Sequence, residues 1–100
     1  MVIKMEELEM TPEEEEKILK NCFSSLEPLR LKVFSSKAKK KAVIIKKIAG
    51  QFEAGKTYTE MEVNGILKQI YPEDFSTLRR SLIETGYLDR KSDGSAYWVK

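Results

Sequence analysis

The stretch that decides the fold runs from Thr59 to Gly86 and reads TEMEVNGILKQIYPEDFSTLRRSLIETG. It opens on a capping box, in which the Thr59 and Glu62 side chains each satisfy a free amide at the helix start. Apolar residues at helical spacing then predict a helix that ends before Pro72, because proline cannot continue a helix. The apolar stripe of this helix consists of Val63, Ile66, Leu67 and Ile70.

A second helix is predicted after the proline. Asp74 or Ser76 can cap its start, and Gly86 can end it because glycine adopts the left-handed conformation at little cost. Its apolar positions predict a buried face of Phe75, Leu78, Leu82 and Ile83. At about 100° per residue, the opposite side presents Ser76, Thr77, Arg80, Ser81 and Glu84.

Two short runs rich in β-forming residues follow, Tyr87–Lys91 and Ala96–Val99. They flank Ser92-Asp93-Gly94-Ser95, and Asp-Gly is among the strongest short hairpin signals. The sequence therefore predicts a two-stranded hairpin after the second helix.

A further helix is predicted upstream, from residue 37 to about Phe52, with Ser35-Ser36 as its N-cap. Its apolar side consists of Ala38, Ile44, Ile45, Ile48, Ala49 and Phe52. Its other side carries Lys39, Lys40, Lys46 and Lys47. Ala54-Gly55-Lys56 then forms a turn, and Thr57-Tyr58 leads into the capping box.

The N-terminal part of the chain predicts an amphipathic helix over residues 12–26. Thr11 is its cap, Pro12 suits the first helical position, and the glutamates at 13–16 favour the positive end of the helix dipole. The apolar stripe consists of Ile18, Leu19, Cys22, Phe23 and Leu26. Glu27-Pro28 stops this helix, and residues 29–34 alternate apolar with basic side chains, which indicates a short extended connector.

From residue 35 onward, this order of elements predicts a winged helix-turn-helix. We expect a mainly α protein with a small β-hairpin, in which an N-terminal amphipathic helix precedes the winged helix. Residues 1–34 would be an acidic N-terminal extension, comprising the helix over about 12–26 and the extended connector. Residues 35–100 would be the winged-helix domain.

Composition limits the chemistry of this 100-residue chain. It has no histidine, so a Ser-His-Asp or Cys-His catalytic centre cannot be built. The single cysteine, Cys22, permits neither an intrachain disulfide nor a zinc-binding cysteine cluster, and its place on an apolar stripe indicates packing. We expect no catalytic residues, no metal and no cofactor.

The charge is distributed unevenly. The net charge is +2, but residues 1–35 carry five basic and eight acidic side chains, a balance of −3, whereas residues 36–100 carry thirteen and eight, a balance of +5. The basic part is therefore the expected site of an anionic partner. No apolar run approaches the roughly 18 residues of a membrane span, and no export signal is evident, so we expect a cytoplasmic protein that does not bind membranes.

Duplex DNA is the expected partner. The helix that begins near Asp74 would enter the major groove, with Arg80 contacting a base or a phosphate and the hydroxyls of Ser76 and Thr77 close to phosphate. Arg90 and Lys91 on the hairpin would contact the flanking backbone, and the four lysines of helix 37–52 would add a second basic surface.

Alternative interpretations accompany these sites. The lysines of helix 37–52 are equally compatible with a solvated face, and Glu84 on the proposed reading face would repel phosphate. Arg79 either faces a ligand or bridges to Asp89 or Glu62. Trp98 on the hairpin is expected in the core rather than as a platform for bases.

From Val33 to Val99 the chain resembles a prokaryotic family, domain of unknown function twenty eighty-seven. The resemblance rests above all on the runs at 48–60, Thr77-Leu78-Arg79-Arg80 and Gly94-Ser95-Ala96-Tyr97-Trp98. The chain departs from the family pattern at Ser35, where the family often has Pro, and at Gly65, where a bulkier residue is usual.

The resemblance implies a transcriptional regulator, since that is the usual label of the family. Some members carry a separate helix-turn-helix domain, which implies an alternative role as a protein-interaction or dimerisation module. A homodimer is compatible with either function. The DNA site and any small-molecule effector are left open by the sequence.

Overall fold

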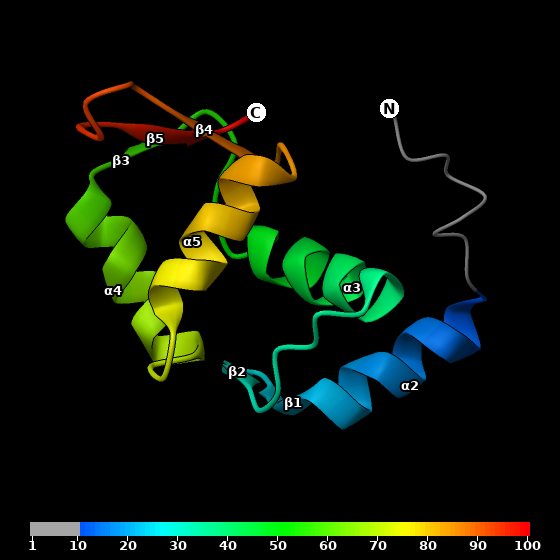
Figure 1. Cartoon of the computed structure of the whole chain (residues 1–100). Helices are drawn as coiled ribbons and strands as arrows, with labels where there is room; N and C mark the ends of the chain where they lie inside the picture. Colours follow the sequence, from blue (N-terminus) through cyan, green and yellow to red (C-terminus); the bar gives the residue numbers. More distant parts are fainter. Residues whose placement is uncertain (1–10) are drawn as a thin grey trace. The chain divides into compact units, whose positions relative to one another are not determined.

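Four helices and two small antiparallel sheets make up residues 11–100, the part of the chain that the computed structural model describes (Figure 1). The prediction of a helical chain with a small β component is confirmed. Backbone contacts divide the chain into two units, and the boundary falls between Ile44 and Ile45, inside helix α3 (Ala38–Ala49).

The first unit contains helix α2 (Pro12–Cys22). The side chain of Thr11 accepts a hydrogen bond from the backbone N–H of Glu14 at 3.2 Å, which confirms the predicted cap. Three glutamates in the first turn lie at the positive end of the helix dipole. The prediction that this helix continues to residue 26 is wrong, because the backbone becomes extended at Phe23.

The residues after α2 form a hairpin. Strand β1 (Phe23–Leu26) pairs antiparallel with β2 (Leu29–Leu31) across the Glu27-Pro28 turn. Two serines in β1 weaken the helix, because serine hydroxyls compete for backbone hydrogen bonds, and the proline turn brings a second extended run alongside. The predicted extended character of residues 29–31 is confirmed, with Leu29 and Leu31 buried.

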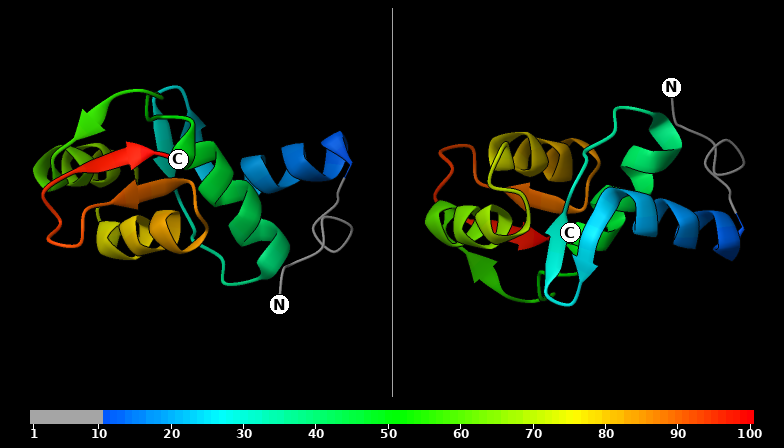
Figure 2. Two further views of the ribbon diagram at one scale, coloured as in Figure 1. Left: turned by 90° about the horizontal axis from the view of Figure 1, so that it is seen from above. Right: turned by 90° about the horizontal axis from the view of Figure 1, so that it is seen from below.

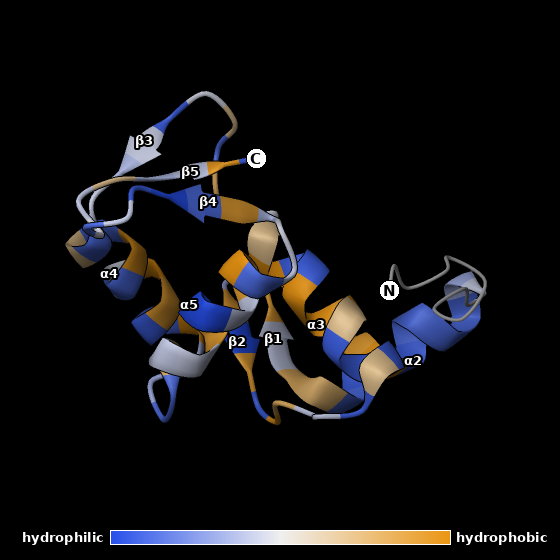
Figure 3. Cartoon of the chain, turned by 45° about the horizontal axis from the view of Figure 1, so that its top comes forward, coloured by the Kyte–Doolittle hydropathy of each residue, from blue (hydrophilic) through white to orange (hydrophobic). Residues whose placement is uncertain are grey.

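Helix α3 is shorter than predicted. It ends at Ala49, and residues 50–52 form a turn that places Phe52 in a buried position outside the helix. Ala38 is exposed, so its predicted place in the apolar stripe is wrong, whereas Ile44, Ile45 and Ile48 are fully buried as expected. In Figure 3 this helix carries both hydrophobic and hydrophilic segments.

The second unit continues with strand β3 (Thr57–Tyr58), helices α4 (Glu60–Ile70) and α5 (Phe75–Glu84), and strands β4 (Leu88–Arg90) and β5 (Tyr97–Val99). The C-terminal hairpin is confirmed. Strand β3 was not predicted, because a two-residue strand has no periodicity of its own. It pairs with β5, so the sheet order is β3-β5-β4, as the left view of Figure 2 shows.

The helix ends of this unit follow the sequence signals. The capping box at Thr59 and Glu62 is present, with hydrogen bonds of 2.9 and 3.1 Å. Asp74, one of the two predicted candidates, caps α5 by accepting from the backbone N–H of Thr77 at 3.3 Å. Gly86 follows α5 with a φ of 84°, in the left-handed region that favours glycine.

Helices α4 and α5 pack against each other through their apolar stripes. Val63, Leu67, Leu78 and Leu82 are all fully buried. Ser81 is only 3% exposed, so its predicted place on the polar face of α5 is wrong. It lies beside the buried Leu78 on the same side of the helix, three positions further along.

Candidate nucleic-acid interface

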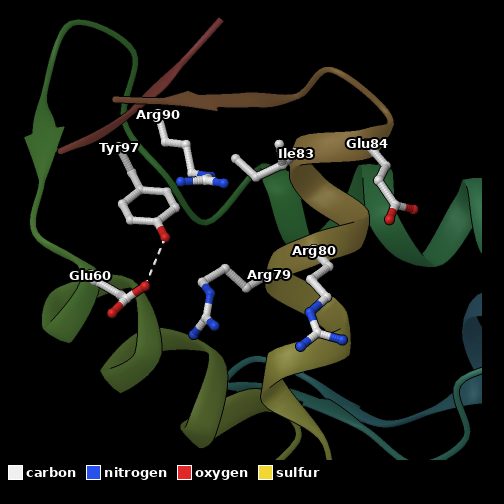
Figure 4. A pocket seen from close by; sticks show the side chains of 7 residues that line it. All are labelled: Glu60, Arg79, Arg80, Ile83, Glu84, Arg90 and Tyr97. Carbon is white, nitrogen blue, oxygen red and sulfur yellow. Dashed lines mark hydrogen bonds between the residues drawn. The ribbon is translucent and has the colours of Figure 1, made fainter. Parts of the chain in front are cut away.

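A pocket of about 380 Å³ lies between α5, the start of α4 and the β4–β5 hairpin (Figure 4). It combines three arginines, two glutamates, one tyrosine and one isoleucine. The lining residues are Glu60, Arg79, Arg80, Ile83, Glu84, Arg90 and Tyr97.

Two of the three arginines are held by the protein itself. Arg79 donates a hydrogen bond from Nη1 to Oδ1 of Asn64, which links α5 to α4. Arg90 donates from Nη1 to the backbone oxygens of Lys91 and Ser92, both at 3.3 Å. These bonds orient each guanidinium and leave its remaining N–H groups available to a ligand.

Arg80 and Glu84 differ from these two. They lie one turn apart on α5, both side chains are exposed, and neither forms a side-chain hydrogen bond or an ion pair with any residue between 11 and 100. Arg80 and Glu84 are therefore the pocket residues on α5 whose whole polar group has no partner among residues 11–100.

A polar contact closes the side of the pocket opposite Glu84. The hydroxyl of Tyr97 donates a hydrogen bond to Oε1 of Glu60 at 3.0 Å (Figure 4). Burial raises the pKa of the Tyr97 hydroxyl, and the bond to Glu60 raises it further. Tyr97 therefore stays protonated near neutral pH and serves as a donor.

The pocket has a net positive field. No carboxylate among residues 11–100 lies within 4.0 Å of an arginine nitrogen of the pocket. In the view of Figure 4, Glu60 and Tyr97 are on one side and Glu84 is on the other, with the three arginines between them. Such an arrangement attracts an anion to its centre and a hydrogen-bond donor to its edge.

Two of the predicted site residues, Arg80 and Arg90, come together in this pocket, although they belong to different elements. Ser76, Thr77 and Lys91 do not line it. The hydroxyl of Thr77 donates to Oδ2 of Asp74 at 2.6 Å, so this proton belongs to the helix cap. Ser76 is half-buried and Lys91 is exposed.

The predicted lysines lie along α3. Lys39, Lys46 and Lys47 are exposed and Lys40 is half-buried. Lys46 and Lys47 belong to the last turn, where cations also stabilise the helix dipole. Their exposure is compatible with phosphate contacts and equally with a solvated face.

Five pocket residues were not among the predicted sites: Glu60, Arg79, Ile83, Glu84 and Tyr97. Arg79 was expected to face a ligand or to bridge to Asp89 or Glu62. It lines the pocket, and its hydrogen-bond partner is Asn64, so the predicted bridge to Asp89 or Glu62 is wrong. Glu60 and Tyr97 are 37 positions apart, so no local pattern connects them. The adjacent Arg79-Arg80 pair was the one available signal.

Neither a metal site nor a membrane span is found in residues 11–100. No three His, Cys, Asp or Glu side chains gather there in a way that could hold a metal ion. No helix in this range has the length and apolar character needed to cross a bilayer.

Comparison with protein families identifies the chain. The model of a bacterial family, described as "Uncharacterized protein conserved in bacteria (DUF2087)", matches residues 30–99. The chain therefore belongs to this family, and the resemblance inferred from residues 33–99 is confirmed. Comparison with curated proteins and with solved structures gave no match.

Proposed function

We propose that this protein binds duplex DNA as a winged-helix transcriptional regulator, without enzymatic activity, in the bacterial cytoplasm. The order α3, α4, α5 and the β4–β5 hairpin supports this proposal, because it is the order of a winged helix-turn-helix. In this arrangement α5 is the helix that enters the major groove, and the hairpin is the wing.

The meeting of Arg80 and Arg90 in one pocket is the observation that carries the proposal. A groove-reading helix and a wing bind the same duplex only if their basic side chains face a common space. Arg80 is the best candidate for a base or a phosphate contact because its guanidinium has no partner among residues 11–100, and Arg90 is the candidate for the flanking backbone.

The other basic residues would add affinity without sequence preference. Lys39, Lys40, Lys46 and Lys47 on α3 and Lys91 after β4 would contact phosphates, and each phosphate that is neutralised releases counterions. Ser76 and Thr77 lie in the first turn of α5, where backbone N–H groups also favour phosphate. The Thr77 hydroxyl would act as an acceptor, because its proton is directed to Asp74.

The test is fluorescence anisotropy with a random duplex pool, titrated at about 50 and about 200 mM salt. We expect affinity to fall at least tenfold over that range, and again when the four α3 lysines are changed to glutamate. Lys17→Ala is the matched control, because Lys17 is an exposed cation on α2 outside the proposed interface. Absence of binding at the lower salt concentration contradicts the proposal.

Arg80→Ala tests the reading helix. If Arg80 forms a bidentate contact to a base, the substitution costs roughly 1 to 3 kcal/mol and relaxes preference at one position of a selected site. Equal affinity of the variant and the wild type for that site would remove Arg80 from the mechanism.

A second candidate function is protein interaction or dimerisation. Two apolar side chains of the first unit favour it, because Leu26 is 46% exposed and Val33 is 50% exposed. Sedimentation of the full chain and of a Leu26→Ser/Val33→Ser variant tests this function. A dimer that becomes a monomer on substitution supports it, whereas a wild type that is monomeric at all concentrations argues against self-association.

A further inference from the structure

The pocket of the second unit has more kinds of polar side chain than binding to a DNA backbone requires. Phosphates account for three arginines, and Tyr97 accounts for Glu60, but neither accounts for the carboxylate of Glu84, because a carboxylate repels a polyanion. A ligand that uses the whole lining has an anionic group for the arginines and a hydrogen-bond donor for a glutamate, since an ionised carboxylate only accepts.

We infer that this pocket binds a free nucleoside monophosphate, with guanine as the preferred base. The volume of about 380 Å³ is within the range of small-ligand pockets, which extends from about 300 to 1,000 Å³, and exceeds the space that a lone phosphate needs.

The phosphate lies among Arg79, Arg80 and Arg90. Each guanidinium presents paired N–H groups that match the geometry of phosphate oxygens. The hydrogen bonds from Arg79 to Asn64 and from Arg90 to the backbone hold two of these groups in place before the ligand arrives. Arg80 completes the cluster with a guanidinium that has no partner in the described part of the chain, residues 11–100.

The base lies toward Glu84. Guanine presents two adjacent donors, N1–H and N2–H₂, on its Watson–Crick edge, and the two oxygens of one carboxylate accept from both. Adenine does not present this pair, so the carboxylate of Glu84, which has no partner between residues 11 and 100, favours guanine. Glu60 is less suited to the role because its Oε1 already accepts from Tyr97. Ile83, which is half-buried, offers an apolar contact to the base ring.

The test is isothermal titration calorimetry of the full chain with guanosine monophosphate, adenosine monophosphate, guanosine and inorganic phosphate. We expect guanosine monophosphate to bind at least tenfold more tightly than each of the other three. Arg80→Ala should weaken its binding at least tenfold, and Glu84→Gln should abolish the preference for guanine over adenine. Lys17→Ala should change neither the affinity for guanosine monophosphate nor the preference for guanine, because it removes one exposed positive charge outside the pocket.

Two results overturn the inference. Inorganic phosphate that binds as tightly as the nucleotide would make the pocket a simple anion site, and absence of binding by every probe would leave it without a ligand of this class. Circular dichroism of each variant separates loss of binding from loss of fold. Because the titration contains no DNA, its outcome is independent of whether the protein binds a duplex.

Discussion

The hydroxyl of Tyr97 donates a hydrogen bond to Oε1 of Glu60 at 3.0 Å, and it joins strand β5 to the first turn of α4. The β4–β5 turn lies close to the same carboxylate, since a Cβ at Gly94 would be 3.7 Å from Oε1. Together with the pairing of β3 and β5, this contact places the hairpin beside the helices. The pocket depends on that placement, because Arg90 reaches it from the hairpin.

Replacing Tyr97 with Phe should lower the free energy of unfolding by about 1 kcal/mol, because it removes one hydrogen bond and retains the buried ring. Urea denaturation of the wild type and the variant measures the difference. Glu60→Gln is the control, since the amide oxygen still accepts and should retain most of the stability. An unchanged midpoint for Tyr97→Phe would show that the hydrogen bond contributes nothing.

The capping box should make stability depend on pH. The backbone N–H of Thr59 donates to Glu62 and holds the pKa of this carboxyl below its ordinary value of 4.5. A carboxylate with a lowered pKa in the folded state stabilises the fold above its unfolded pKa, and this contribution is lost as the pH falls through the folded pKa. Glu62→Gln should therefore show a smaller decrease in Tm than the wild type between about pH 5 and about pH 3.

Thermal unfolding followed by circular dichroism over this pH range makes the comparison. Glu73→Gln is the matched control, because Glu73 is exposed and accepts no side-chain hydrogen bond among residues 11–100. It should retain the full pH dependence of the wild type. Equal slopes for Glu62→Gln and Glu73→Gln would contradict the role assigned to the cap.

Gly65→Ala should stabilise the protein by about 0.5 to 1 kcal/mol. Gly65 is exposed in the middle of α4, and an added Cβ would meet no other atom within 4 Å, so the gain in helix propensity has no steric cost. Gly86→Ala should destabilise the protein, because Gly86 has a φ of 84°, a conformation that is strained for alanine. Denaturant midpoints of the two variants test this contrast, and a destabilised Gly65→Ala would show that α4 needs the glycine.

Leu82→Ala should lower the free energy of unfolding by about 2 to 5 kcal/mol, since Leu82 is fully buried in α5 and its truncation leaves a cavity. Leu26→Ala, at an exposed position in β1, should change it by less than about 0.5 kcal/mol. Chemical denaturation gives both values. Similar effects for the two substitutions would mean that Leu26 is covered in solution, as the interaction function requires.

Features that depend on a few neighbouring residues were predictable from the sequence. The caps at Thr11, Thr59 and Asp74 follow from side chains that reach a backbone N–H three positions away, and the stop at Gly86 follows from the left-handed conformation that glycine adopts at little cost. The apolar stripes of α4 and α5 were predicted for the same reason, because helical geometry alone places them on one face. The Asp-Gly signal likewise identified the C-terminal hairpin.

Features that depend on pairing or packing with another segment of the chain required the tertiary structure. Phe23-Ser24-Ser25-Leu26 is compatible with a helix, and it becomes a strand because Leu29–Leu31 is available to pair with it. Thr57-Tyr58 becomes a strand through its pairing with β5, and Ser81 is buried although its polarity predicted a solvent-facing position.

The pocket likewise combines residues that the sequence indicated with contacts that only the structure shows. The sequence indicated Arg80 and Arg90 as separate basic residues, but their convergence with Glu60 and Tyr97 depends on how the hairpin packs beside the helices. Local sequence determined the helix starts, the apolar stripes of α4 and α5 and the C-terminal hairpin, because caps and helical periodicity act within a turn or two. Tertiary structure decided which side chains share a site. Those contacts join positions tens of residues apart, and no pattern within a short stretch of sequence indicates which distant residues will meet.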